Sequence, residues 1–249
     1  MAQWVEAGLW GLAGGGALVL GALVAWLVEV PRDVVAVVMA FGAGVLTAAA
    51  AFELVDEAER TGGLLATSVG FAAGAVVYVL ANVLLARLGA RHRKRSSNQP
   101  SESDQAGSGT AIAVGALLDG VPESVVLGVG LLGGGGVGVA MLAAVVISNV
   151  PEGLSSVAGM KRAGRGPGYV FGVWGAIAVA GGVSAALGNL LLAGASPQVI
   201  AVITAVAAGA ILAMIADTMI PEAFERTHLY TGLCLTAGFL TAFVVERLG

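Results

Sequence analysis

Two short polar stretches, LDGVPES and SNVPEG, lie inside long apolar segments, and each contains a Pro-Glu pair. In the first, Asp119 precedes Glu123 by four positions, and in the second, Ser148 and Asn149 precede Glu152. Residues three or four positions apart share one face of a helix, so each stretch presents its polar groups together. Carboxylate, amide and hydroxyl oxygens are ligands that suit divalent cations. The sequence therefore predicts a cation site where the two stretches meet.

The prolines of these stretches bear on the backbone around the predicted site. Pro122 and Pro151 have no N–H, so the carbonyls of Leu118 and Ile147 lose their usual helical partner. We therefore expect two broken helices that aim carboxylates and freed carbonyls at the same spot.

Acidic side chains are costly at these positions. Insertion scales put an acidic residue at a helix centre at roughly +2.5–3.5 kcal/mol, so Asp119, Glu123 and Glu152 together would cost about 7–11 kcal/mol. The two apolar segments that carry them contain no Lys or Arg. Protons, water or a metal cation must compensate this cost. The alternative is that each acid is protonated and helps the helices to pack through hydrogen bonds.

The composition shows which elements must position these groups. The 249 residues are 57% hydrophobic and only 11% charged, whereas soluble domains carry roughly a quarter charged residues. We predict an all-α polytopic membrane protein, a single transmembrane domain over 1–249, with eight transmembrane helices. The predicted spans are approximately 7–28, 34–54, 63–88, 110–132, 136–159, 169–194, 198–222 and 228–247.

The basic residues predict the orientation of the chain. With both the N- and C-termini outside, only Arg60 and Arg247 lie on the outer side, which is a strong positive-inside bias. The inner basic residues are then Arg32, Arg87, Arg91, Arg93, Lys94, Arg95, Lys161, Arg162, Arg165 and Arg226. Residues 91–109 are basic and then polar, without apolar residues to bury, and we expect a disordered cytoplasmic loop there. The expected location is the plasma (inner) membrane.

An internal repeat is visible as well. Residues 43–58 (AGVLTAAAAFELVDEA) align without gaps with residues 208–223 (AGAILAMIADTMIPEA). The first segment lies at the outer end of its span and the second at the inner end. This opposition predicts an inverted repeat of helices 1–3 and 6–8 around helices 4 and 5, as is typical of secondary transporters.

The repeated segments carry a second group of acids. Glu53 and Asp56 lie near the outer end of one span, and Asp217 and Glu222 near the inner end of another. We interpret them as possible entrance and exit stations, with simple solvation at the span ends as the alternative. The methionines within the apolar runs are interpreted as packing residues rather than metal ligands. The glycine pairs with small-xxx-small spacing predict close helix contacts; they are Gly11/Gly15, Gly70/Gly74 and Gly168/Gly172.

The paired Pro-Glu motifs, the eight spans, the variable loop after the third span and the Ile-Pro-Glu ending of the seventh resemble the ZIP (Zrt/Irt-like) family of zinc and iron permeases. The resemblance implies that the metal ligands are Asp119, Glu123, Ser148, Asn149 and Glu152. It also implies a homodimer, inward transport, and a movable unit of spans 1, 4, 5 and 6 against spans 2, 3, 7 and 8.

Several positions depart from the family pattern. Asp119 stands where the family usually has His, and Asn149 where an acidic residue is common. Gly181 and Gly182 stand where some members have an acid that completes a second metal site. A single site built from oxygen ligands is therefore expected. Such a site is compatible with zinc, manganese, ferrous iron or cadmium.

The expected function is transport of a divalent metal cation, zinc or a similar ion, toward the cytoplasm. One alternative is a proton-coupled carrier of another small solute, in which the carboxylates relay protons. Another is a metal sensor that does not transport. No catalytic motif points to an enzyme, and the basic residues are confined to a few loops, so no nucleic-acid partner is expected. The expected partners are the metal cation, the lipid bilayer and a second copy of the chain.

Overall fold

The chain folds into a bundle of long helices in a computed structural model that describes residues 1–88, 101, 104, 108–133 and 139–248. The described residues contain no β-strand. The elements are α1 (Gln3–Leu27), α2 (Arg32–Ala49), η1 (Ala50–Val55), α3 (Asp56–Arg87), α4 (Ser108–Gly130), η3 (Leu131–Gly133), α5 (Val139–Arg162), α6 (Pro167–Leu192), α7 (Pro197–Met214), η4 (Ile215–Met219), α8 (Ile220–Thr227), η5 (His228–Tyr230) and α9 (Thr231–Leu248).

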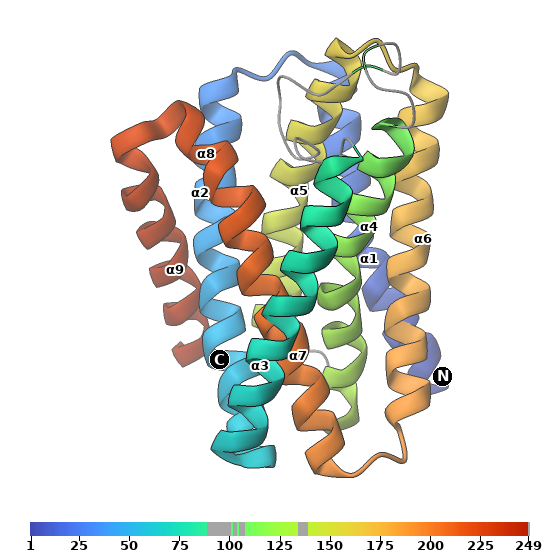
Figure 1. Cartoon of the computed structure of the whole chain (residues 1–249), viewed down its shortest axis with the longest axis vertical. Coiled ribbons are helices and arrows are strands. Elements are labelled where there is room, and N and C mark those ends of the chain that lie inside the picture. Colours follow the sequence, from blue (N-terminus) through green and yellow to red (C-terminus); the bar gives the residue numbers. More distant parts are fainter. Residues whose placement is uncertain (89–100, 102–103, 105–107, 134–138, 249) are drawn as a thin grey trace.

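Six helical segments of the described chain are long and apolar enough to cross a membrane, which supports a polytopic membrane protein. Two of them, Arg32–Arg87 and Pro197–Arg247, have 56 and 51 residues. A straight helix of that length would measure about 75–85 Å, far more than the ~30 Å hydrocarbon core. Figure 1 shows that both segments fold back on themselves. Non-helical backbone lies at Gly63 in the first and at His228 in the second, each with positive φ.

The helix does not end where the predicted span ends at 54, because the chain stays helical from η1 into α3 as far as Gly63, where the next predicted span begins. Residues 56–60 are good helix formers apart from Asp56, and an ion pair of 2.6 Å joins Asp56 to Arg60 one turn later. Most of the predicted loop 91–109 lies outside the described residues.

The predicted breaks at the two prolines are also wrong. Helix α4 runs through Pro122 and α5 runs through Pro151. Membrane helices tolerate proline where neighbouring helices and side chains satisfy the backbone. Both helices therefore remain continuous although each proline removes one backbone hydrogen bond.

Helices α1, α4, α5 and α6 pack as one group, called here the first bundle. Its helices approach closely enough that a Cβ atom on Gly21 would overlap the carbonyl oxygen of Val150. A Cβ atom on Gly153 would likewise overlap the carbonyl oxygen of Leu18. Glycine is thus required on both sides of the contact between α1 and α5.

Helices α2, α3, α7, α8 and α9, with η1 and η4, form a second group, called here the second bundle. Its pair α2–α9 again meets through glycine, because Cβ atoms on Gly44 and Gly238 would overlap the carbonyl oxygens of Leu235 and Phe41. The main contacts between the two bundles are those of α2 with α5 and of α4 with α7.

The pair α3–α7 repeats the contact of α2 with α9 at shifted positions. Gly209 faces the carbonyl oxygen of Phe71, and Gly74 faces that of Val206. In the alignment of the two repeated sequences, Gly44 corresponds to Gly209. The same shift in residue number takes Phe41, whose carbonyl oxygen faces Gly238, to Val206, whose carbonyl oxygen faces Gly74.

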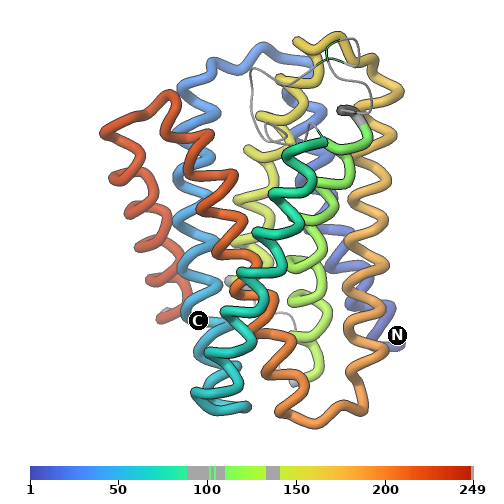
Figure 2. Tube along the Cα trace, in the orientation of Figure 1, coloured from blue at the N-terminus to red at the C-terminus, as the bar shows by residue number. Residues whose placement is uncertain are grey.

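The first bundle repeats its own glycine contacts in the same way. A Cβ on Gly128 of α4 would overlap the carbonyl oxygen of Ala185 in α6. In the same way, a Cβ on Gly153 of α5 would overlap the carbonyl oxygen of Leu18 in α1. A Cβ on Gly188 would lie 3.5 Å from the carbonyl oxygen of Val125. Figure 2 shows that α1 and α6 run in opposite directions along the long axis of the molecule.

The glycine pairs singled out in the sequence behave differently. The pairs Gly11/Gly15 and Gly70/Gly74 have atoms of a neighbouring helix within 3.1 Å of a built Cβ, which confirms close approach. Gly168 and Gly172 have nothing within 4 Å, so the predicted close contact is wrong for them.

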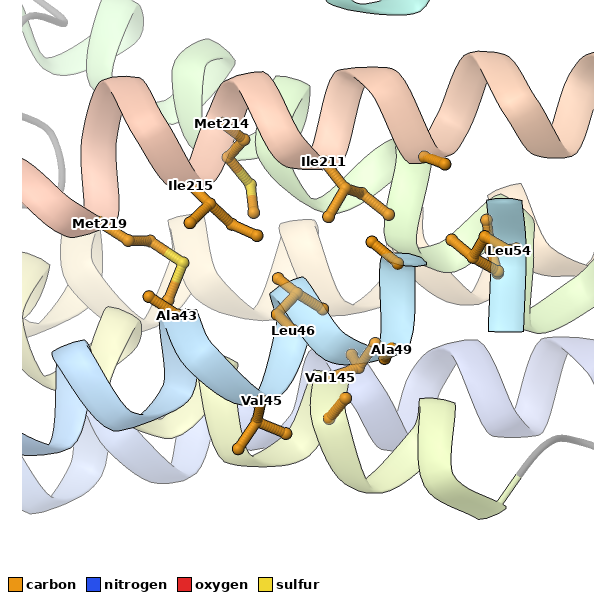
Figure 3. Packing of buried hydrophobic residues seen from close by; sticks show 14 of the residues in the cluster. Ala43, Val45, Leu46, Ala49, Leu54, Val145, Ile211, Met214, Ile215 and Met219 are labelled. Carbon is orange, nitrogen blue, oxygen red and sulfur yellow. The ribbon is translucent and has the colours of Figure 1, made fainter. Parts of the chain in front are cut away.

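The largest apolar cluster of the described residues lies between α2, α5, α7 and η4. Figure 3 shows Leu46, Val145, Ile211 and Met214 filling this space. A smaller cluster around Trp174 lies within the first bundle. The methionines predicted to serve packing are all buried in these clusters, which confirms that prediction: Met39, Met141, Met160, Met214 and Met219.

Candidate functional site

Every residue of the predicted cation site is buried. The exposed fraction is 4% or less for Asp119 and Glu123 on α4 and for Ser148, Asn149 and Glu152 on α5. No Lys, Arg or His is buried among the described residues. The site is therefore a region of acidic and neutral polar groups within an apolar helical bundle.

Asp119 bonds to the second bundle. The hydroxyl of Tyr78 on α3 donates a 2.5 Å hydrogen bond to Oδ1 of Asp119 on α4, and both residues are buried. When Asp119 is ionised, such a hydrogen bond contributes roughly 1.5–3 kcal/mol. This contact thus ties the two bundles together at the predicted site.

Glu222 on α8 makes a second buried hydrogen bond between the two bundles. Oγ of Ser155 on α5 donates a 2.9 Å hydrogen bond to Oε1 of Glu222 on α8, and both residues are buried. Glu222 was predicted as a station at a span end, whereas only 5% of it is exposed. It therefore belongs with the buried carboxylates of α4 and α5 rather than with the solvated acids.

The neutral polar residues of α5 are held by backbone groups. Nδ2 of Asn149 donates to the carbonyl oxygen of Gly14 on α1 at 3.0 Å, which directs the amide oxygen away from α1. Oγ of Ser148 donates to the carbonyl oxygen of Val145 at 3.0 Å. A Cβ on Gly42 of α2 would lie 3.1 Å from Cα of Ser148, so this turn of α5 lies directly against the second bundle.

The carboxylates of the predicted site do not form a metal-binding group in this arrangement. Helices α4 and α5 make little direct contact, because α4 packs mainly on α6 and α5 packs mainly on α1 and α2. Among the described residues, no three His, Cys, Asp or Glu side chains lie close enough to hold a metal ion.

The predicted entrance and exit residues fall in two classes. Asp56 has an exposed fraction of 46% and pairs with Arg60. Asp217 is exposed and accepts a 3.1 Å hydrogen bond from Nδ2 of Asn82 on α3. Glu53 is half-buried within η1. Of the four acids, only the one on α8 is buried at the contact between the bundles.

Glu53 and Asp217 lie on the two π-helical segments found among the described residues. These segments, η1 and η4, begin at Ala50 and Ile215, which correspond in the alignment of the repeated sequences. A π-helical turn inserts an extra residue into a helix and is frequent at functional sites. The two aligned segments therefore carry the same helix distortion, each with one acid on it.

Neither the scan of protein-family models nor the search of curated proteins yields a match to this chain. Its function is therefore inferred from its own residues and their arrangement.

Proposed function

We propose that the protein is a divalent metal cation transporter related to the ZIP family, and that Asp119, Glu123 and Glu152 receive the metal. The observation that carries this proposal is the burial of four carboxylates, these three and Glu222, in a bundle of membrane-type helices. Among the described residues of this bundle, no Lys, Arg or His is buried. At roughly 2.5–3.5 kcal/mol each, four acids at helix centres would cost about 10–14 kcal/mol, and hydrogen bonds such as Tyr78–Asp119 and Ser155–Glu222 offset part of this cost. A transported cation compensates this cost and gives the carboxylates a function.

The proposed architecture has eight membrane spans in an inverted repeat, with spans 1–3 related to spans 6–8. Three observations support it: the matching glycine contacts in α2–α9 and α3–α7, the matching π-helical segments η1 and η4, and the opposite directions of α1 and α6. Transporters built this way bind their substrate near the midplane, between the repeats.

In the proposed mechanism the first bundle moves against the second. The tightest backbone contacts lie within each bundle, whereas the two buried side-chain hydrogen bonds Tyr78–Asp119 and Ser155–Glu222 cross between them. Bonds that join moving units must break and re-form, and side-chain bonds do so without disturbing a helix. Movement also provides a way for carboxylates that are separate in this arrangement to gather around a cation.

The proposed ligands are the three carboxylates together with Oγ of Ser148 and the amide oxygen of Asn149. An all-oxygen set is compatible with zinc, manganese, ferrous iron and cadmium. The proposal further includes a homodimer in the plasma (inner) membrane, both termini outside, and transport toward the cytoplasm. The distribution of Lys and Arg supports this orientation.

Two measurements on the purified protein test this proposal against its alternatives. Thermal unfolding with added zinc, manganese, ferrous iron or cadmium reports binding, because a ligand at a hundredfold excess over its Kd stabilises by about 2.7 kcal/mol. Influx of the same ions into proteoliposomes with a trapped indicator reports transport. Binding with influx is the expected result. Binding without influx would indicate a sensor, and neither would indicate a proton-coupled carrier of another solute.

A further inference from the structure

A pocket of about 390 Å³ lies at one end of the bundle, and none of the buried carboxylates lines it. Its walls are the last turn of α1, the connection to α2, the start of α2 and the last turns of α5. Figure 1 shows this end at the top of the view, where α1 leads into α2 and α5 into α6. Its volume falls within the range of pockets that hold small ligands.

Three basic side chains converge on this pocket. Arg32 from α2 and Lys161 and Arg162 from α5 line it, together with one acid, Glu29, so cations outnumber anions. Arg162 also lies within electrostatic range of Arg226. Guanidinium and ammonium groups arranged in this way suit a phosphate group, which arginine binds through paired hydrogen bonds.

Lys161 is held in place for this role. Its Nζ donates a 3.1 Å hydrogen bond to the carbonyl oxygen of Trp26 and lies 5.6 Å from the centre of the Trp26 ring. An ammonium group has three donors, so two remain for another acceptor. The lysine is thus fixed at the wall of the pocket with donor capacity left.

The start of α2 adds backbone donors to the same wall. Helix α2 begins at Arg32, after Pro31, and no side chain caps it. The first N–H groups of a helix lack intrahelical acceptors and favour an anion. The first-turn residue Asp33 is exposed and does not line the pocket.

An apolar strip beside the pocket indicates the source of the phosphate. Leu23, Val24, Leu27 and Val28 on the same end of α1 have exposed fractions between 41% and 71%, and Val28 also lines the pocket. Acyl chains can cover such a strip, whereas a soluble phosphate ion cannot. Basic pockets between transmembrane helices are known to bind anionic lipid headgroups.

We propose that this pocket binds the phosphate group of an anionic phospholipid, with Arg32, Lys161 and Arg162 as its ligands. Fixing topology would require basic residues only on one side of the membrane, not around one cavity. The bound headgroup would join the start of α2, in the second bundle, to the end of α5, in the first. This site does not depend on the proposed metal transport.

The test measures lipid binding by the full-length protein in detergent, through its thermal unfolding. Phosphatidylglycerol, phosphatidylcholine and inorganic phosphate are titrated separately into the wild type, the Arg32→Gln/Arg162→Gln variant and a control, Arg60→Gln/Arg247→Gln. The control removes the same charge at the opposite end of the bundle. Loss of two charge-assisted contacts is expected to raise the midpoint concentration for phosphatidylglycerol at least tenfold, and the control to leave it unchanged.

The other possible outcomes of these titrations also decide whether the pocket binds an anionic phospholipid. An equal response to inorganic phosphate would support a phosphate site but assign it to a soluble ion. Equal stabilisation by phosphatidylcholine and phosphatidylglycerol, or equal midpoints in the two variants, would overturn the proposal. If the Arg32→Gln/Arg162→Gln variant does not fold, the three titrations of the wild type still distinguish an anionic headgroup from a neutral lipid.

Discussion

Tyr78→Phe removes the hydroxyl that bonds to Asp119 across the two bundles and keeps the aromatic ring. In Tyr78→Phe, the buried Asp119 carboxylate loses a 2.5 Å hydrogen bond while the ring keeps its packing. A hydrogen bond to a charged group contributes about 1.5–3 kcal/mol, so the metal-free protein is expected to lose that much stability. Thermal unfolding in detergent measures the loss. Tyr230→Phe, at a residue with an exposed fraction of 70%, is the matched control.

The same variant is expected to bind metal more tightly. The hydroxyl stabilises an arrangement in which no three metal-binding side chains gather among the described residues, so its loss lowers the cost of leaving that arrangement. A change of about 1.4 kcal/mol corresponds to a tenfold change in affinity, so the apparent Kd for metal is expected to fall about tenfold or more. A Tyr78→Phe variant that binds metal with unchanged or weaker affinity would refute the reasoning.

Three further variants test the packing, the second contact and the entrance. Gly209→Ala is expected to cost about 1–3 kcal/mol of stability, because its Cβ would overlap a carbonyl oxygen of α3. The control Gly172→Ala, with open space around the residue, is expected to lose no stability, and thermal unfolding compares the two variants. Ser155→Ala removes the donor to the buried Glu222 and is expected to cost about 1.5–3 kcal/mol by the same assay. Glu53→Ala is expected to raise the KM for influx with little change in the maximal rate, and an unchanged KM would remove Glu53 from the entrance.

The membrane-type helices and the burial of the candidate site follow from local sequence. Long apolar runs predict helices that cross a membrane, and spacing of three or four residues puts Asp119 with Glu123 on one face. The helix limits do not follow in the same way. The end of an apolar run marks where a chain leaves lipid, whereas a helix continues as long as its residues favour it, as in 55–62. The two prolines mislead for a related reason, because α4 and α5 continue through them within the packed bundle.

The partners of the buried acids could not be predicted. Tyr78 and Asp119 are 41 positions apart, and Ser155 and Glu222 are 67 apart. No local pattern signals that a tyrosine in one apolar run will meet an acid in another. Only the three-dimensional arrangement, which brings α3 to α4 and Ser155 of α5 to Glu222 of α8, reveals these contacts. The grouping of helices into two bundles was implied by the family resemblance, and the glycine contacts that hold each bundle together come from the structure.

The most direct test of the central claim is zinc influx into proteoliposomes by the Glu123→Gln/Glu152→Gln variant. Both carboxylates are replaced by neutral groups of similar size, and Glu57→Gln/Glu225→Gln, at two exposed glutamates, serves as the control. The protein with both buried carboxylates replaced is expected to lose zinc influx, while the control keeps it. Zinc influx by the Glu123→Gln/Glu152→Gln variant at the same rate as the wild type would contradict the assignment of these carboxylates to the transported cation.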